Sequence, residues 1–214
     1  SMFDQSSLKE IVGGLHNTAI IFISFGKSYL ITSFPDKWQS PVDATVEKFK
    51  VKILPEINQR FQLPRPWTLA GHSRGGEDVA TLCTQIPEEF DKCLMLNPMI
   101  GCDDIYDFFD FSCFSSLVFR ASYTKAQWES HGQNAMLSRA TKMPPTIATG
   151  CSKDAFKLYA PTKNYVAKAQ LLGLPVLFVD GPSGCSHQTF PVQNVLQFLQ
   201  PPIPLVKLDG EEIK

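Results

Sequence analysis

Apolar residues recur along the chain in two spacings, and segments with the two spacings alternate. Short continuous apolar runs, typical of strands buried on both faces, occur at residues 18–25, 67–70, 92–97, 145–149 and 176–180. Segments with helical periodicity, typical of helices that pack on one face, occur at residues 6–15, 43–61, 77–86, 165–172 and 190–199. Strands that alternate with helices predict an α/β fold, in which a mostly parallel sheet is covered by helices on both faces.

Two stretches interrupt this alternation. Residues 99–143 are irregular and rich in aromatic side chains, and residues 201–214 begin with a proline-rich segment. We expect residues 1–200 to form a single domain and residues 201–214 to be a loosely held tail. Residues 99–143 are expected to be an insertion over the carboxyl ends of the strands, where the active residues of such sheets gather. The alternative is that most of these rings pack a small subdomain onto the sheet.

Composition excludes several classes of partner. A hydrophobic content of 43% and a charged content of 19% are those of a globular protein, and the net charge of −1 offers no attraction for nucleic acid or anionic membranes. The longest strongly apolar run, residues 19–23, is too short to cross a membrane. The first residues are polar and acidic, so no signal peptide is visible.

The six cysteines include no C-x-x-C pair, and several, such as Cys93, lie within apolar segments. This pattern favours buried free thiols in a reducing compartment, with disulfides as the alternative. Together with the missing signal peptide, it predicts a cytoplasmic location. No cluster of histidines and cysteines has zinc spacing, so no metal site is predicted.

The segment Gly71-His72-Ser73-Arg74-Gly75-Gly76 lies between a predicted strand and a predicted helix. Strand, G-x-S-x-G, helix is the pattern of a nucleophile elbow, a strained turn that presents a serine hydroxyl. Gly71 and Gly75 are expected to remove Cβ atoms that would collide where strand and helix cross. The backbone N–H of Arg74 then points to where an oxyanion would form.

A serine nucleophile needs a general base, and the base needs an orienting carboxylate. His187 lies between the last predicted strand and the last predicted helix, which is where the base of such a fold belongs. The other histidines, His16, His72 and His131, fit worse. Asp154 follows the strand at 145–149 and is the preferred acid, whereas Asp103, Asp104 and Asp180 are rival candidates.

These residues resemble the α/β-hydrolase esterase group that includes esterase D (S-formylglutathione hydrolase). The elbow is the most specific part of the resemblance, which extends over roughly residues 18–200 through Pro87-Glu88-Glu89-Phe90, Asn97-Pro98, Lys153-Asp154-Ala155-Phe156 and Ser186-His187. It implies that Ser73, Asp154 and His187 are nucleophile, acid and base. It also implies an α/β-hydrolase fold without its first strands, because this chain begins at about the helix that follows them.

In the resembled family a loop after one of those strands supplies a second oxyanion donor. Either that loop belongs to an upstream part absent from this sequence, or another loop, with Phe25 and Gly26 as candidates, supplies the donor. The family usually has methionine where this chain has Arg74, a cation that either favours an anionic substrate or points to solvent or pairs with a carboxylate such as Glu77.

The sequence therefore predicts a serine hydrolase that cleaves a carboxylic ester or thioester through an acyl-serine intermediate. Its partner is a small-molecule acyl substrate, no cofactor is needed, and the oligomeric state is not indicated. The alternative is a catalytically inactive, hydrolase-like module that serves as a binding or interaction surface.

Overall fold

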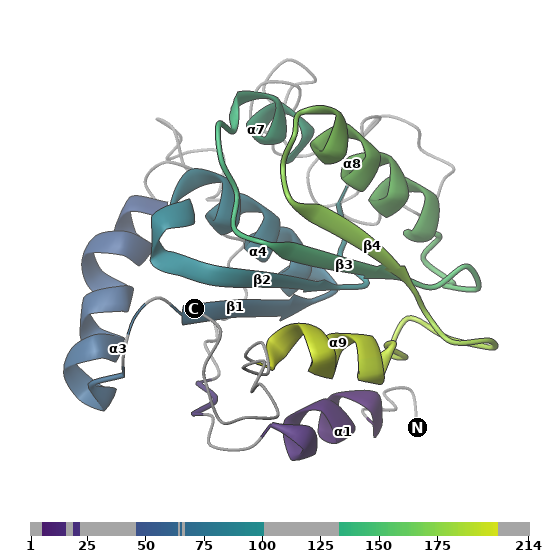
Figure 1. Cartoon of the computed structure of the whole chain (residues 1–214), viewed down its shortest axis with the longest axis horizontal. Helices are drawn as coiled ribbons and strands as arrows, with labels where there is room; N and C mark the ends of the chain where they lie inside the picture. The colour runs from purple at the N-terminus through teal and green to yellow at the C-terminus, as the bar shows by residue number, and fades with distance from the viewer. Residues whose placement is uncertain are drawn as a thin grey trace, which may run out of the picture.

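The computed structural model describes residues 6–15, 19–21, 46–63, 65, 67–100 and 133–200. Four strands form one sheet: β1 (Trp67–His72), β2 (Phe90–Leu96), β3 (Thr146–Gly150) and β4 (Val176–Asp180). All neighbouring strands are parallel, and their order across the sheet is β1-β2-β3-β4, the order of the chain (Figure 1). The carboxyl ends of all four strands therefore meet at one edge.

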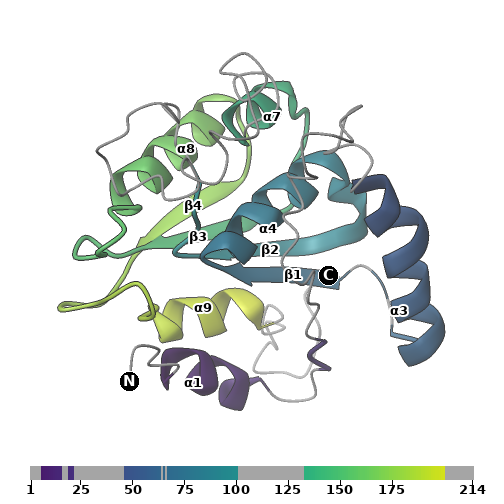
Figure 2. The ribbon, with the colours of Figure 1, turned by 180° about the vertical axis from the view of Figure 1, so that it is seen from behind.

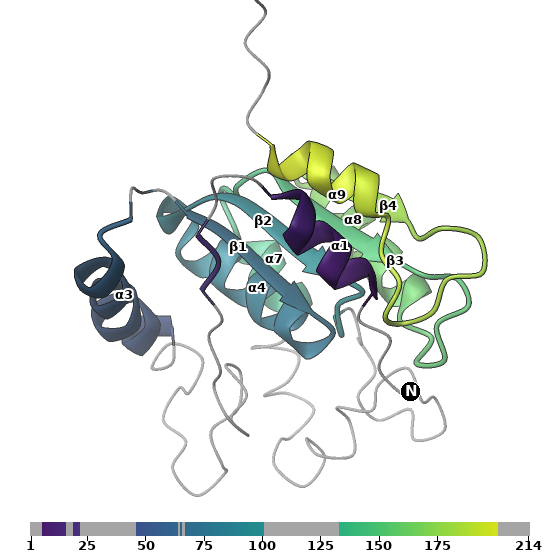
Figure 3. The same cartoon turned by 90° about the horizontal axis from the view of Figure 1, so that it is seen from below.

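Helices cover both faces of this sheet. Helices α4 (Arg74–Gln85), α7 (Gln133–Arg139) and α8 (Tyr159–Leu171) lie on one face, and α1 (Ser6–Gly14) and α9 (Val192–Leu199) lie together on the other (Figures 1 and 3). The π-helical turn Phe49–Ile53 leads into α3 (Leu54–Phe61), which lies to one side of the sheet (Figure 2). A short 3-10 helix, Pro87–Glu89, precedes β2.

The alternation of β2 residues builds two separate cores. Cys93 and Met95 join the buried cluster under α4, α7 and α8, whereas Leu94 and Leu96 join the cluster under α1 and α9. Successive strand side chains point to opposite faces, so a run that is apolar at every position is buried on both sides. The predicted fold class, a mostly parallel sheet with helices on both faces, is confirmed.

Most predicted elements are present, with differences at their ends. The strand at 176–180 has the predicted bounds, whereas α8 begins at Tyr159, six residues before its prediction. Pro161 lies in the first turn of α8, where a proline costs no helical hydrogen bond. Of the strand predicted at 18–25, residues 19–21 are described and form no strand, and Ile20 is 39% exposed. Most of the 99–143 insertion and all of the 201–214 tail lie outside the described residues.

The prediction of free thiols is wrong for four of the six cysteines. Cys83 of α4 is bonded to Cys93 of β2, and Cys151 is bonded to Cys185, with Cα–Cα distances of 6.7 and 5.8 Å. Apolar neighbours indicate burial, and buried cysteines are found both free and bonded. Cys102 and Cys113 lie outside the described residues. A cytoplasmic location stays a prediction, without the support of free thiols.

Among the described helices, none combines the length and the apolar character that crossing a membrane requires.

Candidate active site

Ser73 occupies the turn between β1 and α4, with a backbone φ of 56° and ψ of −117°. A positive φ is costly for a residue with a Cβ atom, so the surrounding structure must hold this turn in place. The N–H of Ser73 donates to the carbonyl of Leu96 at 2.9 Å, and the N–H of Met99 donates to the carbonyl of Ser73 at 2.9 Å. Both bonds tie the turn to the end of β2 and the residues that follow it.

The glycines around Ser73 allow β1 and α4 to approach. A Cβ atom on Gly71 would lie 2.1 Å from the backbone oxygen of Gly75, which no side chain could tolerate. A Cβ atom on Gly75 would meet nothing within 4 Å, so the prediction of a collision is right for Gly71 and wrong for Gly75. The second crowded position is Gly76, where a Cβ atom would lie 2.6 Å from the Cβ of Pro98.

The structure brings Ser73, His187 and Asp154 into one hydrogen-bonded chain. The distance between His187 Nε2 and Ser73 Oγ is 2.9 Å, and that between His187 Nδ1 and Asp154 Oδ2 is 2.7 Å. A neutral imidazole with its hydrogen on Nδ1 satisfies both contacts, because Nδ1–H donates to the carboxylate and Nε2 accepts from the serine hydroxyl. Asp154 and His187 are buried, and the Phe156 N–H donates to the other carboxylate oxygen, Asp154 Oδ1, at 2.8 Å.

Three further side chains contact His187. The Asn97 Nδ2 group donates to the His187 carbonyl at 2.7 Å, and His72 Nε2–H donates to the same oxygen at 3.0 Å. Burial lowers the pKa of His72, which favours the neutral ring. The rings of His72 and Phe156 contact the His187 imidazole, with centroid distances of 4.9 and 4.8 Å.

Arg74 is the first residue of α4, where backbone N–H groups point away from the helix body and the helix dipole favours negative charge. The Nε atom of its side chain is buried. The Arg74 cation acts on Glu77, one turn further along α4, where it opposes a rise in pKa. Phe25 and Gly26, the expected source of a second oxyanion donor, lie outside the described residues.

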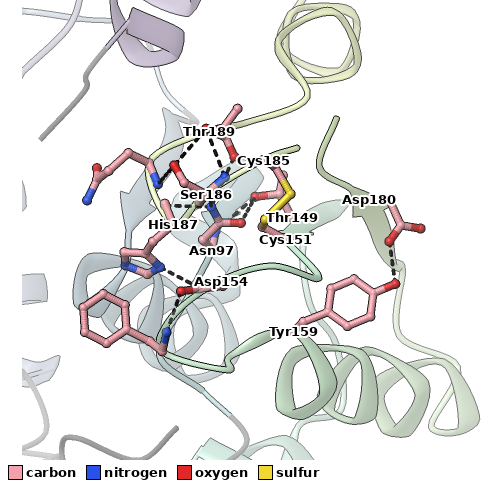
Figure 4. The surroundings of a disulfide bond; sticks show 12 residues. Asn97, Thr149, Cys151, Asp154, Tyr159, Asp180, Cys185, Ser186, His187 and Thr189 are labelled. Atoms are coloured by element: carbon pink, nitrogen blue, oxygen red, sulfur yellow. Dashed lines mark hydrogen bonds and ion pairs between the residues drawn. A yellow bond between two sulfur atoms is a disulfide. The ribbon is translucent and has the colours of Figure 1, made fainter. Parts of the chain in front are cut away.

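Of the rival acids, Asp180 lies among the described residues. Asp180 accepts a hydrogen bond from the Tyr159 hydroxyl at 2.6 Å and is not the partner of His187 (Figure 4). The remaining candidates lie outside the described residues: Asp103, Asp104, His16 and His131.

Glu77 is a buried carboxyl in the first turn of α4. Burial and the nearby Asp78 charge raise its pKa from 4.5 to about 8, against the opposing effects of a Gln133 hydrogen bond and the Arg74 cation. Gln133 Nε2 donates to Glu77 Oε1 at 2.7 Å. The carboxyl is therefore largely protonated at neutral pH.

Two features of the site were not predicted from the sequence. The Cys151–Cys185 disulfide joins the loop that carries Asp154 to the loop that carries His187, and Asn97 reaches the second loop from the end of β2 (Figure 4). The sequence marks Asn97-Pro98 only through the family resemblance. A sequence signal for either feature would require knowing which distant residues meet.

No protein-family model matches the chain, and no curated protein matches it. Solved structures do match. FphF, a fluorophosphonate-binding serine hydrolase of Staphylococcus aureus, is 17% identical over 71% of this chain and 61% of its own, with a TM-score of 0.55. An acylaminoacyl peptidase of Pyrococcus horikoshii is 15% identical over 72% of this chain and 27% of its own, with a TM-score of 0.55.

An S-formylglutathione hydrolase of Agrobacterium tumefaciens is 15% identical over 71% of this chain and 53% of its own, with a TM-score of 0.51. The chain thus spans less than two thirds of each of these three proteins. At such identities the likeness is one of fold, and the fold is that of the α/β-hydrolases. The resemblance inferred from the elbow is confirmed at that level: the solved structures that match include serine hydrolases and an S-formylglutathione hydrolase.

Proposed function

We propose that this protein is a serine hydrolase that cleaves a carboxylic ester or thioester through an acyl-serine intermediate. The observation that carries the proposal is the chain of hydrogen bonds from Ser73 Oγ through the His187 imidazole to Asp154. The backbone of Ser73 has the positive φ that is typical of a nucleophile elbow. A serine hydroxyl is a weak nucleophile until a base receives its proton, and this arrangement supplies both the base and the group that orients it.

In the first half of the reaction, His187 Nε2 takes the Ser73 proton while Oγ attacks the carbonyl carbon of the substrate. The carbonyl oxygen becomes an oxyanion, which accepts a hydrogen bond from the backbone N–H of Arg74 at the start of α4. Collapse of this intermediate breaks the bond to the alcohol or thiol, which leaves with the proton held by His187. The serine is then acylated.

In the second half, His187 removes a proton from water, and the hydroxide attacks the acyl-serine carbonyl. Collapse breaks the bond to Oγ, the proton returns from His187 to Ser73, and the carboxylic acid departs. Asp154 stabilises the imidazolium that forms twice in the cycle. Every proton is handled by these side chains, so the proposed cycle uses no cofactor.

Labelling with a fluorophosphonate probe tests this proposal, because the probe phosphonylates a serine only when a base activates it. FphF is named for binding such probes, and this chain has its fold. We expect the parent protein to be labelled, Ser73→Ala to show no labelling, and His187→Ala to be labelled at least 10²-fold more slowly.

Ser138→Ala is a matched control, since it removes an exposed hydroxyl on α7 that donates to the carbonyl of Asn134 at 2.8 Å. It is expected to be labelled like the parent. A folded parent that takes up no probe contradicts the proposal and leaves the binding module as the interpretation of the fold. Labelling that persists in Ser73→Ala places the reactive serine elsewhere.

A further inference from the structure

Asn97 is a buried polar residue at the end of β2 that contacts the loop carrying His187 (Figure 4). Its Nδ2 group lies 2.7 Å from the carbonyl oxygen of His187, 3.3 Å from that of Thr189 and 3.5 Å from that of Ser186. The shortest of these contacts is made to the histidine itself. One side-chain amide thus gathers the backbone on both sides of His187.

Thr149 holds Asn97 through two hydrogen bonds. Its backbone N–H donates to Thr149 Oγ1 at 3.0 Å, and the same hydroxyl donates to Asn97 Oδ1 at 3.3 Å. Thr149 lies in β3, so the amide is fixed between two neighbouring strands. The φ of Asn97 is 40°, in the left-handed region that asparagine tolerates better than most residues with a side chain. The residue is therefore a rigid extension of the sheet.

His187 belongs to no strand or helix: it lies in irregular backbone between β4 and α9, where the Cys151–Cys185 disulfide and side chains of other elements hold it. Its Nε2 must nevertheless stay within hydrogen-bond distance of Ser73 Oγ, on an element 114 residues away in the chain. The backbone at residue 187 sets where the imidazole begins. The Asn97 amide makes the shorter of two side-chain hydrogen bonds to the carbonyl of that backbone, 2.7 Å against 3.0 Å from His72 Nε2. A displacement of about 1 Å in such a group costs on the order of 10²-fold in rate.

We infer that Asn97 is a positioning residue of the proposed hydrolase: its amide holds the His187 carbonyl so that the imidazole stays aligned with Ser73. This rests on the proposed function. Asn97 does not contact the reacting atoms, and its effect passes through His187. The competing explanation is that the amide only satisfies buried carbonyl groups, which a loop of any function would require.

Asn97→Asp separates these explanations with little change in shape. The aspartate fits the same space and tolerates the same φ, but it presents an acceptor where the amide presented a donor to three carbonyl oxygens. The first measurement is the hydrolysis of p-nitrophenyl acetate by the parent, Asn97→Asp, His187→Ala and the double variant. We expect Asn97→Asp to lower kcat on the order of 10²-fold while KM changes less than about twofold.

The double variant Asn97→Asp/His187→Ala distinguishes the two explanations. If Asn97 acts through His187, then Asn97→Asp does not lower the residual rate of His187→Ala further, beyond a factor of about two. Losses that multiply, or a single variant as active as the parent, overturn the inference. Ser73→Ala identifies the rate that depends on the proposed nucleophile, so that non-enzymatic hydrolysis is subtracted.

Two further variants test the inference if Asn97→Asp does not fold. Asn97→Gly keeps the left-handed backbone and removes the amide, and Thr149→Val removes the hydroxyl that fixes the amide. Thermal unfolding identifies the folded variants. Among these, Asn97→Gly is expected to reproduce the loss in kcat, and Thr149→Val to lower it about 2- to 10-fold. Parent-like kcat in both overturns the inference.

The low-field proton resonance of the His187 Nδ1–H group gives a readout that needs no activity. Positioning by Asn97 predicts that this resonance shifts or broadens in Asn97→Asp and stays unchanged in Ser138→Ala, on the exposed side of α7. If the parent hydrolyses no ester and takes up no probe, the proposed function fails, and this resonance still decides the placement of His187. An unchanged resonance in a folded Asn97→Asp contradicts the inference.

Discussion

Cys151 and Cys185 form a disulfide that joins the two loops on which Asp154 and His187 lie. Asp154 follows Cys151 by three residues, and His187 follows Cys185 by two. The N–H of Gly181 also donates to the carbonyl of Gly150 at 2.7 Å, so the two loops are joined by a hydrogen bond as well as a covalent one. The two loops that bring Asp154 and His187 together are therefore linked to each other at the carboxyl ends of β3 and β4.

Removing this disulfide is expected to affect both stability and reactivity. The bond closes 34 residues, and Cys151→Ser with Cys185→Ser should lower the free energy of unfolding by about 3 to 4 kcal/mol. Looser loops should also slow fluorophosphonate labelling of Ser73, roughly tenfold. Urea unfolding and time-resolved labelling measure the two effects.

The other disulfide provides the matched control. Cys83 and Cys93 are 10 residues apart and join α4 to β2 away from Asp154 and His187. Cys83→Ser with Cys93→Ser should cost about 2 to 3 kcal/mol of stability and leave the labelling rate of the folded protein unchanged. Equal labelling rates in both double variants and the parent contradict a role of the Cys151–Cys185 bond in the site.

The strained backbone of Ser73 predicts an unusual order of stabilities. Its φ of 56° is readily adopted by glycine and costs a residue with a Cβ atom on the order of 1 kcal/mol. Ser73→Gly should therefore be more stable than Ser73→Ala by about that amount, although glycine normally destabilises a folded chain. Urea unfolding of the two variants is the measurement, and an alanine variant as stable as the glycine variant counts against strain at the elbow.

Gly75 and Gly76 are neighbours in α4 with opposite expected responses to alanine. A Cβ atom on Gly76 would lie 2.6 Å from the Cβ of Pro98 and 2.9 Å from its Cα, so Gly76→Ala should cost about 1 to 3 kcal/mol. A Cβ atom on Gly75 meets nothing within 4 Å, so Gly75→Ala should stabilise the helix by up to about 1 kcal/mol. Melting temperatures of the two variants are the measurement, and one that does not fall in Gly76→Ala would falsify the crowding at Gly76.

Glu77 makes stability depend on pH. Its pKa rises from 4.5 in the unfolded chain to about 8 in the folded protein, so between these values unfolding releases a proton. Its contribution is fully present below about pH 4.5 and is lost as the pH rises through about 8, by up to roughly 1.4 kcal/mol for each pH unit.

Glu77→Gln keeps an acceptor for Gln133 and removes the titration, so its stability should fall less steeply between about pH 5 and about pH 8. Urea unfolding across this range measures the slope. Glu56→Gln, on the exposed face of α3, is the control and should keep the slope of the parent. A Glu77→Gln variant with the parental slope shows that another group is responsible.

Local patterns predicted the parts of this molecule that depend on local physics. The strand at Val176–Asp180 was predicted with its bounds because its apolar run lies between Pro175 and Gly181. The elbow was recognisable because its glycine requirement lies within a few residues of Ser73. His187 and Asp154 were predicted from their positions after particular strands, and the structure brings both side chains into one hydrogen-bonded chain with Ser73.

The parts that were missed depend on contacts between distant segments. A cysteine in an apolar segment gives the same pattern whether it is free or bonded, and Cys151 meets Cys185 only after β3 and β4 have paired. Asn97 contacts a carbonyl 90 residues away, and no spacing along the chain marks that contact. The collision that the sequence predicts for a Cβ at Gly75 occurs at Gly76, because only the packed helix shows which of the two glycines faces Pro98.

The strand order β1-β2-β3-β4 has a consequence for the newly made chain. A ribosome releases the segment with Ser73 first, the segment with Asp154 next and the loop with His187 last. A chain that has completed only β1 and α4 presents a serine hydroxyl without a base to activate it. If the proposed activity is correct, it arises only after β4 has paired with β3 and the loop with His187 has reached Ser73. Until then the Ser73 hydroxyl has no base and does not react as a nucleophile.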